Sequence, residues 1–134
     1  MHILNSTKDF FSEIARAADL SLKPWKHSIV YKDDSIDIFS DDFNELIVCL
    51  ECRDIDGERC SKNDLEIEIF RSGADLNITI AWLEFPQRPI LWQGKHSLWM
   101  NATNGKRSSA PVEGEALEAF ARRLRAICSM LKKN

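Results

Sequence analysis

Apolar and polar residues alternate with a period of two in two neighbouring stretches near the middle of the chain. Residues 64–71 read Asp-Leu-Glu-Ile-Glu-Ile-Phe-Arg, and residues 76–82 read Leu-Asn-Ile-Thr-Ile-Ala-Trp. This period puts successive side chains on opposite faces of a strand. The short connection between the two stretches contains Gly73 and Asp75, residue types that tight turns favour. We therefore predict an antiparallel hairpin around which the rest of the chain is organised.

Further β-prone segments flank this hairpin on both sides. They cover residues 28–31, 35–39 and 45–52, followed by a third strand of the meander that runs from Ile90–Trp92 to His96–Met100. The segment 45–52 is the most apolar of them, which predicts a central place in the sheet. Pro86 and Pro89 cannot donate a ladder hydrogen bond, so we expect a bend or a sheet edge between Trp82 and Ile90.

Helical patterns lie at the two ends of the chain. Ser6 to Asp9 resembles a capping box and predicts a helix over residues 8–19. A second helix is predicted to open at Pro111, with Glu113 and Glu115 in its first turn, and to carry an apolar stripe as far as Leu131. We expect a single α+β domain over residues 1–134: an antiparallel β-meander sheet of about five to seven strands, with the N-terminal helix and the long C-terminal helix packed on one face.

The composition is that of an ordinary globular domain. The chain has 134 residues, of which 44% are apolar and 29% charged, enough to build a buried core. No apolar run approaches the roughly 20 residues that span a bilayer, and the first residues lack the basic and apolar regions of a signal peptide. We therefore expect a cytoplasmic protein without a membrane segment.

The formal net charge of −3 conceals an uneven distribution. Residues 33–84 are strongly acidic, whereas residues 85–134 are basic. Two interpretations remain open: the two halves form separate binding faces, or acidic and basic strands pair within one sheet.

The cysteines invite a zinc interpretation that the strand pattern opposes. Cys49, Cys52 and Cys60 have ligand-like spacing, but an odd separation within a strand turns Cys49 and Cys52 to opposite faces. The run Asp54-Ile-Asp-Gly57 resembles part of a calcium loop, yet the first and last positions of that loop would be Cys52 and Asn63 instead of acids. We expect no metal, no cofactor, free thiols and an ordinary turn.

The sequence offers few residues for catalysis. It contains three histidines, at positions 2, 27 and 96, and neither a Gly-x-Ser-x-Gly elbow nor a glycine-rich phosphate loop. An acid–base pair would have to bring His27 or His96 to one of the acids in the segment 33–42. We expect a binding protein more than an enzyme.

Aromatic and basic residues are interleaved in the region 82–107, which we take as the candidate binding site. Its members are Trp82, Arg88, Trp92, Lys95, His96, Trp99, Lys106 and Arg107. In one interpretation the tryptophans fill the core between the sheet and the C-terminal helix. In the other, their rings stack on a partner or on a single nucleic-acid strand.

Three functional hypotheses follow. The first is a small non-catalytic module that binds a protein partner, as an acidic inhibitor or accessory protein would. The second is single-stranded nucleic-acid binding through residues 82–107, which a pI near 5.6 disfavours, because nucleic-acid-binding domains usually have a pI above about 9. The third is a small-ligand carrier or enzyme with a pocket between helix and sheet, lined by Trp92, His96 and Trp99.

Overall fold

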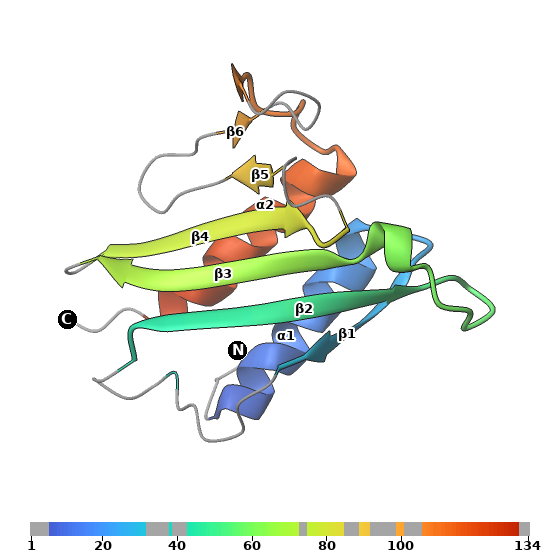
Figure 1. The fold of residues 1–134 in the computed structure, drawn as a ribbon, viewed down its shortest axis with the longest axis horizontal. Helices are drawn as coiled ribbons and strands as arrows, with labels where there is room; N and C mark the ends of the chain where they lie inside the picture. The colour runs from blue at the N-terminus through green and yellow to red at the C-terminus, as the bar shows by residue number, and fades with distance from the viewer. Residues whose placement is uncertain are drawn as a thin grey trace.

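The computed structural model describes residues 6–31, 38, 43–72, 75–84, 89–91, 99–100 and 106–131. Within them the elements are α1 (Thr7–Ser21), β1 (Lys26–Val30), β2 (Glu45–Arg53), the short 3-10 helix η1 (Ser61–Asn63), β3 (Leu65–Ser72), β4 (Asp75–Trp82), β5 (Pro89–Leu91), β6 (Trp99–Met100), β7 (Arg107–Ser108), α2 (Ala116–Cys128) and η2 (Ser129–Leu131). Figure 1 shows a sheet with both α-helices behind it.

The sheet is an antiparallel meander, as predicted. Its five strands follow the order β1-β2-β3-β4-β5, and β6 and β7 form a separate two-stranded pair. The predicted hairpin is the β3–β4 pair, in which Ile67 lies opposite Ile80 and Ile69 opposite Ile78. The α+β fold class is therefore confirmed.

The structure corrects one of the predicted strands and describes little of another. The third meander strand, expected over Ile90–Met100, is wrong as one strand, because β5 pairs with β4 whereas β6 pairs with β7. Most of the predicted strand 35–39 lies outside the described residues; Ile38 alone is described, as a buried residue in a turn.

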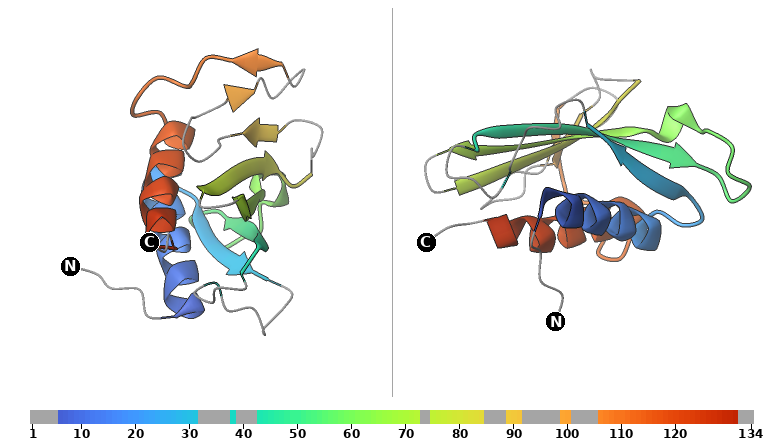
Figure 2. Two further views of the ribbon diagram at one scale, coloured as in Figure 1. Left: turned by 90° about the vertical axis from the view of Figure 1, so that its left-hand side faces the viewer. Right: turned by 90° about the horizontal axis from the view of Figure 1, so that it is seen from below.

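One face of the sheet is apolar and carries both helices (Figure 2). The side chains that alternate inward are buried on three strands: Leu46, Val48, Leu50 and Cys52 on β2, Leu65, Ile67 and Ile69 on β3, and Leu76, Ile78 and Ile80 on β4. All of these residues except Cys52 join the buried sides of α1 and α2 in one hydrophobic cluster. The period-two pattern of the sequence thus sets which face the helices cover.

The two helices run antiparallel, side by side (Figures 1 and 2). The Ser6 side chain caps α1 by accepting a hydrogen bond from the Asp9 backbone N–H, at 3.1 Å, as the capping pattern predicted. Arg123 of α2 donates to the hydroxyl of Ser21 at the end of α1, at 2.7 Å. Neither helix in the described part of the chain has the length and apolar content needed to cross a membrane.

The start of α2 differs from the prediction. The helix begins at Ala116 instead of Pro111, so Glu113 and Glu115 precede its first turn. Gly114 has a φ of +95°, a left-handed conformation that interrupts a helix and that glycine adopts readily. The acid that supports the helix start is Glu118, whose carboxylate accepts the Gly114 N–H at 2.8 Å.

Candidate functional site

The structure describes four of the eight residues of the predicted aromatic–basic site. Trp82 ends β4 and is half-buried, whereas Trp99 in β6 is 7% exposed and belongs to the core. Lys106 and Arg107 are exposed. The remaining four, Arg88, Trp92, Lys95 and His96, lie outside the described residues.

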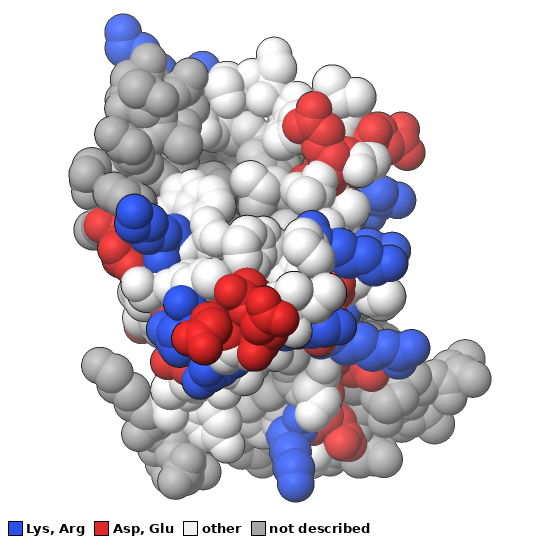
Figure 3. Space-filling view, turned by 90° about the vertical axis from the view of Figure 1, so that its right-hand side faces the viewer, with Lys and Arg blue, Asp and Glu red and all other residues white. Residues whose placement is uncertain are grey.

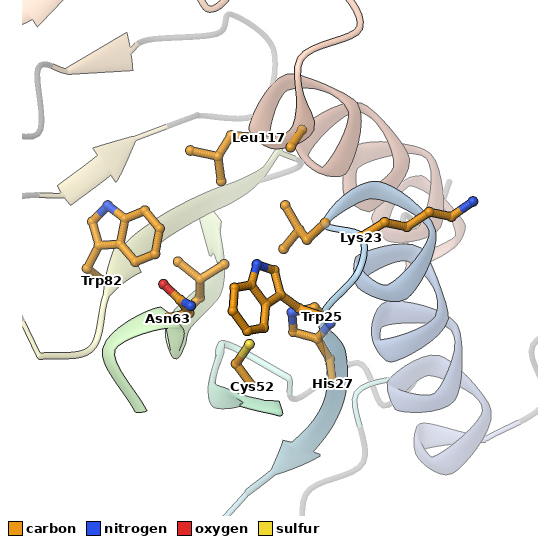
Figure 4. Close-up of a pocket in the computed structure, with 10 residues that line it drawn as sticks. Lys23, Trp25, His27, Cys52, Asn63, Trp82 and Leu117 are labelled. Atoms are coloured by element: carbon orange, nitrogen blue, oxygen red, sulfur yellow. The ribbon is translucent and has the colours of Figure 1, made fainter. Parts of the chain in front are cut away.

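Trp82 instead borders a pocket at one end of the helix–sheet interface (Figure 4). The pocket has a volume of about 190 Å³. Its lining comes from the α1–β1 connection, β1, β2, η1, β3, β4 and α2. The lining residues are Leu22, Lys23, Trp25, His27, Cys52, Asn63, Leu65, Trp82, Ala116 and Leu117. We call this cavity the end pocket.

The meander brings these segments together. In an antiparallel sheet the start of one strand lies beside the end of the next, so β1 and β3 begin where β2 and β4 end. The exit of α1 and the entry of α2 lie at the same end of the molecule (Figure 1). In Figure 3, which looks onto this end, uncharged atoms form a continuous patch above a projecting group of charged residues.

Two indole rings and several aliphatic side chains form most of the end-pocket wall. Trp25 and Trp82 are both half-buried, and Leu65 and Leu117 lie between them on the sheet and helix sides. Figure 4 shows the Lys23 ammonium pointing away from the rings. No acidic side chain is among the described residues that line the pocket, so its interior suits an uncharged group.

A pair formed by the buried His27 imidazole and the half-buried Asp19 carboxylate lies beside this apolar wall. Asp19 Oδ1 lies 3.1 Å from His27 Nδ1, and the same oxygen accepts the His27 backbone N–H at 2.8 Å. The His27 side chain is 1% exposed, and that of Asp19 is 35% exposed. The described partner of His27 is therefore on α1, whereas the acids of segment 33–42 lie outside the described residues.

Cys52 is buried next to the pocket as a protonated thiol. Burial, together with the nearby Cys60 and Asp64, raises the pKa of Cys52 to about 11. Its Sγ lies 4.0 Å from the Arg53 carbonyl oxygen, the acceptor of its hydrogen bond. A thiol in this state is a poor nucleophile, since the thiolate is the reactive form.

The strand places Cys49 and Cys52 as predicted. Cys52 belongs to the buried face of β2, whereas Cys49 lies on the opposite face between buried Val48 and Leu50. The two thiols therefore cannot bind the same metal ion. Among the described residues, no three His, Cys, Asp or Glu side chains gather in a way that could hold a metal ion.

An ion pair fastens η1 to β2 beneath the pocket. Asp64 is 3% exposed and receives two hydrogen bonds from Arg59, at 2.9 and 2.7 Å, and one from the Cys52 N–H at 2.7 Å. Arg59 also donates to the Cys52 carbonyl at 2.8 Å. Burial acts to raise the pKa of Asp64, but the hydrogen bonds from Arg59 and Cys52 outweigh it, and the pKa is lowered. We call this set of contacts the Arg59–Asp64 clasp. It positions Cys52 and Asn63 at the pocket.

The loop after β2 is a turn of ordinary chemistry, as predicted. Asp54 Oδ1 accepts the backbone N–H groups of Asp56 and Glu58, at 2.9 and 3.0 Å. Gly57 has a φ of +88°, which favours glycine at this position. The Asp54 carboxylate is thus engaged in the turn.

The sequence did not single out most of the end pocket. Of the lining residues, the sequence pointed to Trp82, His27 and Cys52 as candidates for binding, catalysis or metal ligation, but not to Trp25, Asn63 or Leu117. One signal was present: a large aromatic residue directly after Pro24, between a helix and a strand, needs an apolar surface nearby.

Comparison with known proteins gives a family. A family described as "Domain of unknown function (DUF8659)" matches residues 11–127, a range that contains every residue lining the end pocket. Neither the curated proteins nor the solved structures gave a match. The chain therefore belongs to the DUF8659 family.

Proposed function

We propose that this protein is a non-catalytic binding module whose end pocket receives a small, uncharged aromatic compound. The observation that carries the proposal is the pairing of Trp25 and Trp82 across a pocket closed by aliphatic side chains. This is the ligand-carrier hypothesis of the sequence, with lining residues other than Trp92, His96 and Trp99.

The size of the pocket supports a ligand of about one ring. An apolar protein cavity of roughly 150 Å³ accepts benzene, and the end pocket measures about 190 Å³. Indole faces favour a planar ring through offset or edge-to-face contacts. The combination suits a compact aromatic molecule more than an extended chain.

The thiol and the imidazole at the pocket do not form a nucleophile–base pair. The hydrogen bond of the Cys52 thiol goes to a backbone carbonyl, and its pKa of about 11 keeps it protonated at neutral pH. Nucleophilic catalysis needs a thiol activated by a base within hydrogen-bond reach. Binding without chemistry is the function that this geometry supports.

Toluene is a direct probe of the proposal. We expect it to shift the indole ¹⁵N–H resonances of Trp25 and Trp82 in a saturable NMR titration, because the ring enters between them. Leu117→Trp should abolish these shifts by filling the pocket with a third indole. Met130→Trp adds the same ring at an exposed position of η2 and serves as the matched control.

The titration has a clear negative outcome. Absence of saturable shifts in the folded wild-type protein would refute the proposal, as would equal toluene binding by the Leu117→Trp variant. Far-UV circular dichroism of each variant establishes that the fold is intact before the comparison is made.

A second candidate function has its own observation, on the face of the sheet opposite the helices. Glu45, Glu66 and Glu68 lie there on neighbouring strands, beside Ile47, which is 48% exposed. The pKa of Glu68 is raised, first by burial and then by the hydrogen bond with Glu45 and the charges of Glu45 and Glu66. A cationic partner would relieve this crowding, in line with an acidic module that binds a basic protein.

Charge-matched variants test this second candidate. Glu45→Gln, Glu66→Gln and Glu68→Gln combined should lose a stoichiometric partner that the wild-type protein captures from native lysate at low salt. Glu84→Gln, Glu113→Gln and Glu115→Gln combined remove the same charge elsewhere and should keep that partner. Equal capture by both variants, or no stoichiometric partner, would exclude docking on this face.

A further inference from the structure

The Asp19–His27 pair places a polar group at a pocket whose wall is mostly apolar. The two residues come from α1 and β1, and β1 is held against α1 partly through the two hydrogen bonds that Asp19 accepts. The carboxylate holds the imidazole in one orientation, as in many functional sites.

The chemistry of a carboxylate decides which ring nitrogen carries the proton. An ionised carboxylate can only accept hydrogen bonds, so Nδ1 of His27 is the donor to Asp19. In the neutral imidazole the other nitrogen, Nε2, is then an acceptor. Asp19 therefore selects the tautomer that offers a lone pair on the far side of the ring.

That lone pair faces the end pocket and has no partner among the residues that the structure describes. His27 lines the pocket, and Figure 4 shows one ring nitrogen turned toward Trp25 and Cys52, away from α1. Within the described residues the hydrogen bond of the ring is the one through Nδ1. The side chain is 1% exposed, yet Nε2 is not among the described buried atoms that lack a partner, so the atom keeps contact with the pocket space and a bound molecule can reach it.

We propose that His27 Nε2 selects aromatic ligands that carry a hydrogen-bond donor on the ring, such as a phenolic hydroxyl or an indole-type N–H. This inference rests on the proposed ligand-binding function and adds the class of ligand. The apolar wall recognises the ring, and the acceptor reads the substituent. The Lys23 ammonium points away from the rings (Figure 4), so the pocket offers no cation for a carboxylated aromatic compound.

Discrimination of this kind is stronger than apolar fit alone provides. A site built to hydrogen-bond a ligand group leaves its own polar atom unpaired when a ligand without that group binds. Phenol and toluene have nearly the same shape and differ in the hydroxyl that donates. They therefore separate the apolar contribution from the polar one.

His27→Asn is the sharpest variant for this purpose. The amide nitrogen of asparagine takes the place of Nδ1 and can still donate to Asp19, while nothing takes the place of Nε2. His27→Gln can restore an acceptor, because its amide oxygen reaches about as far as Nε2. Lys8→Met makes the same kind of change at an exposed position of α1 that does not line the pocket and is the control.

Dissociation constants for phenol and toluene are measured at pH 8 by NMR titration of the indole N–H resonances in each protein. We expect His27→Asn to weaken phenol by about tenfold, the equivalent of one hydrogen bond, and to leave toluene within twofold. His27→Gln should recover part of the phenol affinity, and Lys8→Met should match the wild type. Thermal denaturation of each variant verifies folding.

The other outcomes separate this inference from the proposed function. If phenol and toluene bind the wild type but respond equally to His27→Asn, whether both weaken or neither does, His27 does not read a donor and the inference is overturned. If neither compound binds the wild type, the proposed function fails and the inference with it. Loss of phenol affinity in Lys8→Met would also overturn it.

Discussion

The two ends of the helix–sheet interface are built from the same strands and helices, yet one end is filled and the other is hollow. At the filled end Leu46, Ile69, Leu76 and Leu131 are each at most 5% exposed. At the hollow end Trp25, Trp82 and Leu117 remain half-buried around the end pocket. The difference lies in side-chain shape, since compact aliphatic groups interdigitate across strands and helix, whereas the large rings of Trp25 before β1 and Trp82 at the end of β4 leave space between them.

The polar contacts at the two ends differ in the same sense. In the described part of the filled end, Arg71 Nη2 donates to the Leu131 carbonyl at the helix terminus, at 3.2 Å, and the guanidinium lies 5.2 Å from the Phe43 ring centre. The hollow end has the Arg59–Asp64 clasp and the Asp19–His27 pair. A cavity that stays open needs such fixed points, because its walls lack the mutual packing that holds the filled end.

Two leucines of α2 allow the sharpest test of this comparison. Leu124 and Leu117 lie about two helical turns apart on one face; Leu124 is fully buried and Leu117 borders the pocket. Leu124→Ala should cost about 2–5 kcal/mol of unfolding free energy, and Leu117→Ala about 1 kcal/mol or less, because space already exists beside it. Urea denaturation measures both, and equal losses would mean that the ends are packed alike.

The arginines give the next largest contrast. Arg59→Ala should cost about 2–3 kcal/mol, because it leaves the Asp64 carboxylate buried without its cation. Arg71→Ala should cost about 1 kcal/mol, since it removes one hydrogen bond and one cation–π contact. Chemical denaturation of the two variants at pH 7 compares them. A greater loss for Arg71→Ala would place the critical fixed point at the filled end.

The clasp also predicts a dependence on pH. The folded-state pKa of Asp64 is lowered by Arg59 and Cys52 against the effect of burial. Its contribution is therefore fully present above the unfolded-state pKa of about 4 and is lost as the pH falls through the lower folded-state value. Unfolding free energies measured from pH 6 to pH 2 should fall more steeply for the wild type than for Asp64→Asn, and parallel curves would contradict the assignment.

The smallest expected effect lies on the opposite face of the sheet and calibrates the others. Glu68→Gln should stabilise the protein by about 0.5 kcal/mol at pH 7, because it removes repulsion among neighbouring carboxylates. Thermal melts of this variant provide the measurement. A destabilisation would show that Glu68 makes a favourable contact that outweighs this repulsion.

The alternating residues of the sheet made the fold predictable. The period of two is a local property of the chain, so it predicts both the strands and the face that the helices cover. Ile67, Ile69, Ile78 and Ile80 are examples. The start of α2 was misjudged because the positive φ of Gly114 and the capping by Glu118 are details of backbone conformation. Composition near Pro111 does not reveal them.

The candidate site was far less predictable, for a physical reason. Asp19 and His27 meet because a helix end and a strand start lie side by side, and Trp25 and Trp82 face one another across the meander. Such meetings depend on how elements pack and not on spacing in the sequence. The prediction for residues 82–107 captured Trp82 but assigned it neighbours by sequence proximity.

The position of the indoles has a practical consequence. Two of the four tryptophans of the chain stand at the mouth of one cavity, and indole emission moves to shorter wavelength when water beside the ring is displaced. Occupancy of the cavity should thus shift the intrinsic tryptophan emission of the unlabelled protein to shorter wavelength. A library of non-absorbing compounds can be screened with the light that the molecule itself emits.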